Sequence, residues 1–157
     1  MADLRALLAG EGFDDVRTYL QSGNVVLSSS AKPDKVARKC EQLIEEAFGL
    51  DIAVVTRTRS ELAQIVKRNP LGKVAQNPKR YQVSFLAAKA PAELVRRLES
   101  AVVPPERLTV VGREIYAWHP EGVARSKLWA LAGRQLGVTA TARNWTTVTK
   151  LLELAAE

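Results

Sequence analysis

Few residues in this sequence could do catalytic chemistry. There is one histidine, His119, and one cysteine, Cys40. A Ser/His/Asp hydrolase would need His119 as its base, and the Gly-x-Ser-x-Gly turn that presents a nucleophilic serine does not occur. A Cys/His metal cluster needs more ligands than these, and the glycine patterns of phosphate-binding loops and dinucleotide sites are missing. We therefore predict no catalytic residue, no metal and no cofactor, which favours a non-enzymatic protein while leaving an enzyme open.

A cation, an amide and a large ring, Arg143, Asn144 and Trp145, precede the apolar pattern of the last helix. Thr141 can cap this helix through its hydroxyl, which would put Asn144 and Trp145 in its first turn. In a structural interpretation Trp145 fastens the helix to the core and Asn144 bonds a neighbouring loop. In a functional one the amides at the helix start and Arg143 hold an anion. Ser126-Lys127 stands at a second helix start of the same kind.

A second polar group lies at the turn Gln21-Ser22-Gly23-Asn24. Turn chemistry alone explains a serine, a glycine and an asparagine there, but it explains Gln21 less well. If this turn faces the closing helix, a polar ligand site between the two halves of the chain results. The predicted ligand-binding residues are Gln21, Ser22, Asn24, Ser126, Lys127, Arg143, Asn144 and Trp145.

The net charge of +6 comes from one segment. Between Arg57 and Arg80 there are seven basic residues and one acid, Glu61, whereas the charges of the other residues cancel. A polyanion such as nucleic acid would be attracted to this segment if its charges share a face. The alternative is a solvated surface that keeps the protein soluble. The predicted anion-binding residues are Lys67, Arg68, Lys73, Lys79 and Arg80.

The elements that must position these residues follow from periodicity and breakers. We expect hairpins around Ser22-Gly23 and Gly112-Arg113, because glycine accepts the positive φ of such turns. The expected helices cover residues 3–10, 34–48, 60–68, 91–102, 126–136 and 143–156. The expected strands cover residues 15–21, 24–29, 51–56, 80–87, 108–111 and 114–118.

This order predicts an α+β fold of two ferredoxin-like subdomains packed as one compact unit. The first subdomain, residues 1–57, has the order helix, strand, strand, helix, strand, and so lacks its initial strand. The second subdomain, residues 58–157, carries two closing helices. Nothing between them resembles a flexible linker.

Three segments together resemble one family of bacterial proteins, number 1697 among the domains of unknown function. They are TYLQSGNVVLSS from residue 18, the stop Asn69-Pro70, and the segment from residue 126 that contains TARNWTTV. The resemblance implies an α+β fold with ferredoxin-like parts and no established activity. Members of the family generally begin earlier, with a strand and a glycine-containing segment. We therefore expect Met1 to be an internal start or a boundary, which reading the upstream codons would test.

From these features we expect a cytoplasmic, non-enzymatic protein that binds an anionic partner, with nucleic acid as the candidate. No stretch of the sequence has the roughly 20 apolar residues of a membrane span. Two alternatives stay open. One is a protein or enzyme that binds a phosphate-bearing small molecule between the subdomains, and the other is a structural or oligomerising domain that uses an open sheet edge.

Overall fold

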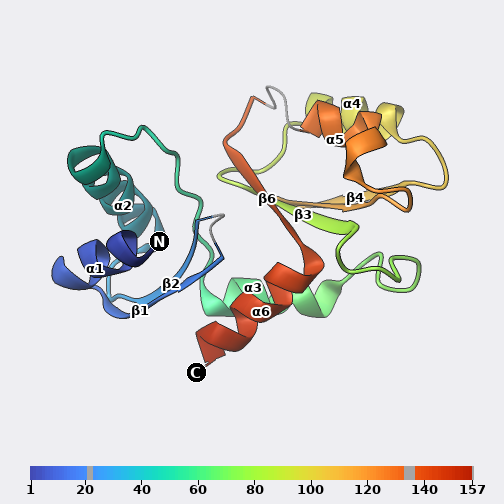
Figure 1. Cartoon of the computed structure of the whole chain (residues 1–157). Coiled ribbons are helices and arrows are strands. Elements are labelled where there is room, and N and C mark those ends of the chain that lie inside the picture. The colour runs from blue at the N-terminus through green and yellow to red at the C-terminus, as the bar shows by residue number, and fades with distance from the viewer. Residues whose placement is uncertain (21–22, 133–136, 157) are drawn as a thin grey trace. The chain divides into compact units, whose positions relative to one another are not determined.

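The computed structural model describes residues 1–20, 23–132 and 137–156, with the side chains of residues 125, 127, 131 and 132 left out. The chain divides into two compact units. The first comprises residues 1–63 with the chain's end from Lys150, and the second comprises Gln64–Thr149. Figure 1 shows the course of the chain.

In the first unit two helices accompany a hairpin (Figure 1). The hairpin consists of β1 (Asp14–Tyr19) and β2 (Asn24–Ser28), which pair antiparallel as predicted. Helix α1 (Ala2–Gly10) and helix α2 (Pro33–Phe48) match the predicted helices within two residues. Helix α2 ends at Gly49 in the left-handed conformation that glycine adopts without strain. The core of the unit contains Leu8, Phe13, Cys40 and Leu43.

The strand predicted for residues 51–56 is wrong, because this segment has no strand partner in the described chain. The N–H of Val54 donates instead to the Oε1 carboxylate oxygen of Glu41 on α2, at 2.9 Å. The hydroxyl of Thr56 donates to the carbonyl of Pro33. A side chain of α2 therefore takes the backbone bond of Val54 that a neighbouring strand would have supplied.

The second unit is built on a four-stranded antiparallel sheet in the order β4-β5-β3-β6. Its strands are β3 (Tyr81–Leu86), β4 (Arg107–Val111), β5 (Glu114–Trp118) and β6 (Ala140–Asn144). All six residues of β3 are buried, which fits its central position between β5 and β6. The hairpin β4–β5 turns at Gly112 as predicted, with φ of 58°.

Helices α4 (Ala92–Ala101) and α5 (Lys127–Ala132) lie together on one face of this sheet (Figure 1). They enclose a core with Leu86 of β3 and Ile115 and Ala117 of β5, to which α4 contributes Leu94 and Leu98. Including these helices, the unit runs strand, helix, strand, strand, helix, strand. This is the order of the ferredoxin-like motif.

Strand β6 was not predicted from the sequence. Residues 143 and 144 were expected inside the last helix, yet they end strand β6, and α6 covers Trp145–Ala156. The segment Ala140–Asn144 carries little hydrophobic signal of its own. It is extended because it completes the pairing of the buried β3, with Val83 opposite Arg143.

Helix α3 (Arg59–Arg68) begins as a capping box, in which Thr58 and Glu61 bond each other's backbone N–H groups. The last residues of α6 belong to the first unit, where Arg17 of β1 donates to the carbonyl of Leu154 at 3.1 Å. The prediction of an α+β fold is confirmed by the two antiparallel sheets with their helices. Among the described residues, no helix combines the length and apolarity needed to cross a membrane.

Candidate functional site

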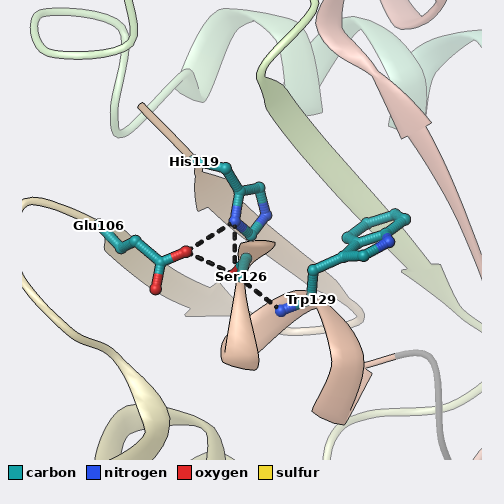
Figure 2. A network of polar contacts seen from close by, with 4 residues as sticks. All are labelled: Glu106, His119, Ser126 and Trp129. Carbon is teal, nitrogen blue, oxygen red and sulfur yellow. Dashed lines mark hydrogen bonds and ion pairs between the residues drawn. The ribbon is translucent and has the colours of Figure 1, made fainter. Parts of the chain in front are cut away.

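A buried polar network joins three residues of the second unit (Figure 2). His119 Nδ1 lies 3.0 Å from Glu106 Oε2 and 3.0 Å from Ser126 Oγ. The Ser126 hydroxyl donates to the same oxygen of Glu106 at 2.5 Å and accepts the backbone N–H of Trp129 at 3.0 Å. The His119 side chain is fully buried, and the Glu106 side chain is 14% exposed. The carboxylate oxygen is therefore the acceptor at the centre of the network.

This arrangement fixes which nitrogen of His119 carries hydrogen. Glu106 Oε2 can only accept when the carboxylate is ionised, so Nδ1 must be the donor. The other ring nitrogen, Nε2, is buried and has no hydrogen-bond partner in the described chain. The imidazole packs edge-to-face with Trp129, with ring centres 5.8 Å apart. The ring is thus held by Glu106 at one nitrogen and packed against indole beside it.

The ends of two strands bring the network together. Glu106 immediately precedes β4, His119 immediately follows β5, and the register places Arg107 opposite Trp118. The backbone N–H of His119 donates to the carbonyl of Arg80, which continues the pairing beyond the start of β3. Ser126 follows a short 3-10 turn and caps α5 through its bond to Trp129. Strand ends and a helix cap are rigid supports, so the polar atoms are held in place.

A cavity of about 240 Å³ opens beside the network, lined by residues 103–106, 120–122 and 126. Its aliphatic walls come from Val103, Pro104, Pro105 and Pro120. Its polar lining includes the side chains of two acids, Glu106 and Glu121, and Ser126. Among the described residues, the lining of the cavity therefore combines apolar surfaces with negative charge.

The network does not have the geometry of a serine hydrolase. In such an enzyme one imidazole nitrogen accepts the serine proton while the other is held by the acid. Here Ser126 and Glu106 meet the same nitrogen of His119, and the serine proton goes to the carboxylate. This arrangement holds a carboxylate in place. Among the described residues, no cluster of three or more His, Cys, Asp or Glu could hold a metal ion.

The residues at the start of the last helix have other partners than expected. Asn144 Oδ1 accepts the N–H of Thr147 at 2.9 Å, so Asn144 rather than Thr141 is the cap of α6. The correction follows from β6, because the residue between a strand and a helix is placed to cap the helix. Trp145 stacks on Tyr81 with ring centres 4.7 Å apart. Trp145 therefore fastens the start of the helix to the sheet, as the structural interpretation proposed.

Arg143 lies on β6 rather than at a helix start. Its Nη1 donates to Thr141 Oγ1 at 2.7 Å and to the carbonyl of Ala142 at 2.8 Å. Burial lowers the pKa of its guanidinium from the ordinary value. Part of its hydrogen-bonding capacity is thus used within its own strand.

The remaining predicted ligand-binding residues are in different situations. Asn24 is buried, and its side-chain amide donates to the carbonyl of Tyr19 across the hairpin at 2.9 Å. Gln21, Ser22 and the side chain of Lys127 lie outside the described residues. Ser126 belongs to the network described above. The ligand site between the subdomains stays a prediction.

All five predicted anion-binding residues are exposed and lie in the second unit. Lys67 and Arg68 form the last turn of α3, while Lys73, Lys79 and Arg80 lie in the following loop. The Arg68 guanidinium is 3.9 Å from Glu114, and Arg80 donates to the carbonyl of Pro120. The ammonium groups of the three lysines have no hydrogen bond or ion pair in the part of the chain that the structure describes. Their ammonium groups are open to solvent and to a partner.

Hydrogen bonds close the loop 69–80 at its base. The hydroxyl of Tyr81 donates to Asn69 Oδ1 at 3.0 Å and accepts the N–H of Leu71 at 3.4 Å. The N–H of Trp145 donates to the carbonyl of Pro78, which connects the end of the loop to the start of α6. Burial raises the pKa of Tyr81 to about 12, with a smaller opposing effect of its bond to Leu71. A neutral phenol thus holds the two ends of the basic loop together.

Comparison with known proteins places this fold in a family. Residues 1–116 match the family described as protein of unknown function, DUF1697. The chain belongs to this family. A solved structure of a conserved bacterial protein from Streptococcus pneumoniae has a similar fold, with a TM-score of 0.72 and 16% identity. The similarity covers 99% of this chain and 88% of the other. No curated protein matches.

The match to DUF1697 ends within the polar network. The basic loop and Glu106 fall inside the matched residues, whereas His119 and Ser126 follow them. Sequence reasoning considered His119 and Ser126 separately and missed Glu106 altogether. The predicted hairpin could have pointed to Glu106, because its strands bring the residues around 106 and 119 together at the end opposite the turn. Nothing in the sequence marked Glu106 among the chain's other acids.

Proposed function

We propose that this protein is a non-enzymatic, cytoplasmic binding protein for nucleic acid, which it contacts through the basic loop of residues 69–80 and the adjoining last turn of α3. The observation that carries the proposal is the loop's closed base, where Tyr81 bonds both Asn69 and Leu71. Arg68 and Arg80 directly adjoin the two residues that form this closure. The closure supports a concentration of charge on one surface.

Charge and exposure support a polyanion as the partner. Backbone hydrogen bonds from residues 72, 74, 75 and 80 to carbonyls within the loop fold it into successive turns. The loop is therefore largely ordered before binding, and ordering it costs little on association. Each lysine or arginine that neutralises a phosphate releases a condensed counterion. Five such residues give a dependence of affinity on salt that a neutral ligand would not show.

The test is binding of a fluorescent single-stranded oligonucleotide at several salt concentrations. If all five cations contact phosphates, log K should fall against log salt with a slope of about −3.5. The triple variant Lys67→Glu, Lys73→Glu and Lys79→Glu should bind on the order of a hundredfold more weakly, and its slope should shrink by about 2. These lysines are exposed, so the fold should survive.

A matched variant separates a specific surface from net charge. Lys32→Glu, Lys35→Glu and Lys89→Glu change the total charge by the same amount at exposed positions outside the loop. This control should lose less than about threefold in affinity at moderate salt. Equal losses in the two triple variants, or no binding by the unaltered protein at low salt, would refute the proposal.

A further inference from the structure

The charged residues described in the cavity lining are Glu106 and Glu121, whose charge is opposite to that of the basic loop. All the side-chain hydrogen bonds of Glu106 in the described chain are made by Oε2, which faces His119 and Ser126. The second carboxylate oxygen points away from both residues (Figure 2). Glu106 and the exposed Glu121 both line the cavity. One firmly held carboxylate thus keeps an acceptor oxygen that the network does not use.

We propose that this cavity is a binding site for a small organic cation, whose ammonium or guanidinium group donates to Oε1 of Glu106. Charge-assisted hydrogen bonds of this kind are the stronger ones in proteins. Glu121 at the rim adds attraction for the same charge. The aliphatic part of the ligand packs against Pro104, Pro105 and Pro120, which are rigid and offer no donor of their own.

The size of the cavity limits the ligand. A volume of 240 Å³ corresponds to about eight water molecules, given roughly 30 Å³ for each in the liquid. This lies below the range of most drug-sized sites, so a short alkyl amine, an alkyl guanidine or a single basic side chain fits. A nucleotide would bring phosphate next to two carboxylates, which disfavours it here.

His119 and Ser126 act as positioning residues in this site. Both hold Oε2 of Glu106, and His119 is fully buried, so the carboxylate has one orientation. A carboxylate fixed before binding loses little freedom when the cation arrives. In this proposal the network therefore orients the Glu106 carboxylate for the cation, in addition to capping α5.

The experiment follows backbone amide signals of the full chain by NMR during titration with n-butylammonium and n-butylguanidinium. Both cations should shift the amides of Gly122 and Ser126 saturably, with dissociation constants on the order of millimolar for ligands of this size. The neutral n-butanol and the anionic n-butyrate should not. Glu106→Gln should weaken binding of both cations at least tenfold, because the amide carries no charge.

Two further variants keep the test decisive. Glu121→Gln should weaken binding of the cations about threefold. If Glu106→Gln does not fold, this variant by itself tests whether cation binding depends on the carboxylates of the cavity. Glu99→Gln, an exposed acid on α4 outside the cavity, should bind as the unaltered protein does. No saturable shift with either cation, equal shifts with n-butanol, or unchanged binding by both Glu106→Gln and Glu121→Gln would overturn the site. The triple lysine variant of the basic loop should bind the cations normally, which makes this result independent of nucleic-acid binding.

Discussion

Two helices of the second unit begin with a polar cap, yet the two caps belong to different environments. At the start of α6, Asn144 accepts one backbone N–H, and the neighbouring Trp145 stacks on Tyr81. At the start of α5, Ser126 accepts one backbone N–H and also bonds Glu106, close to His119. The first cap is accounted for by helix capping and packing. The second cap is also part of a polar network with a carboxylate and an imidazole, and it lines a cavity.

This difference shows how a candidate site can be separated from a structural cap. Both starts had been considered as anion sites because their residue types are alike. In the structure, Ser126 at the α5 start bonds the carboxylate of Glu106, whose charge favours a cation. The sign of the nearest buried charge, rather than the identity of the capping residue, decides which ligand a helix start can take.

We expect the largest loss of stability from His119→Ala, which disrupts the network at the start of α5. The imidazole is fully buried, so its removal leaves a hole and takes a donor from Glu106. We expect a loss of about 3 kcal/mol in the free energy of unfolding, measured by urea denaturation. The control is Glu121→Ala at the exposed rim, which should change stability by less than about 0.5 kcal/mol. A loss for His119→Ala as small as that of the control would mean that the network is not rigid.

A direct comparison of the caps gives an intermediate effect. Asn144→Ala removes a capping bond and should cost about 1 kcal/mol. Ser126→Ala removes a capping bond and also a bond to a carboxylate, and should cost about 2 kcal/mol. Thermal or urea unfolding of both variants measures the difference. Equal losses would contradict the distinction drawn here, since the carboxylate bond would then add nothing.

The fold could be predicted from sequence wherever the signal is local. Gly49 and Gly112 marked a helix end and a hairpin, and both are found there. Strand β6 could not be predicted, because Ala140–Asn144 is extended only through its pairing with the buried β3. The expected strand at residues 51–56 failed for the converse reason, since Glu41 of α2 takes the N–H of Val54. Each error concerns a segment whose conformation is set by a distant partner.

The candidate site was less predictable than the fold. Capping propensity placed Ser126 correctly at a helix start but chose Thr141 instead of Asn144 as the cap of α6. Propensity also carries no information on long-range contacts. Glu106 meets Ser126 across 20 residues of chain, and Tyr81 meets Asn69 across 12. Such pairs follow from strand register and loop closure, which a single sequence does not encode in any local pattern.

The last prediction tests the α6 side through pH. Burial raises the pKa of Tyr81, beneath Trp145, to about 12, against about 10 in the unfolded chain. Below pH 10 the phenol is protonated in both states, so its contribution to stability is fully present. Between about pH 10 and 12 the unfolded state loses its proton first, so stability falls as pH rises, by about 2 kcal/mol at pH 12. The loss is complete above the folded pKa.

Urea unfolding of the unaltered protein and of Tyr81→Phe, at about pH 9 and about pH 11.5, isolates this contribution. Burial also raises the pKa of Tyr116, but that residue is present in both proteins and cancels. Tyr81→Phe should be less stable at the lower pH, because the N–H of Leu71 and the amide of Asn69 lose their partner. It should lose less stability than the unaltered protein on going to the higher pH. An identical loss in both proteins would show that Tyr81 is accessible to water, and the closed base of the basic loop would then have to be abandoned along with the rigid start of α6.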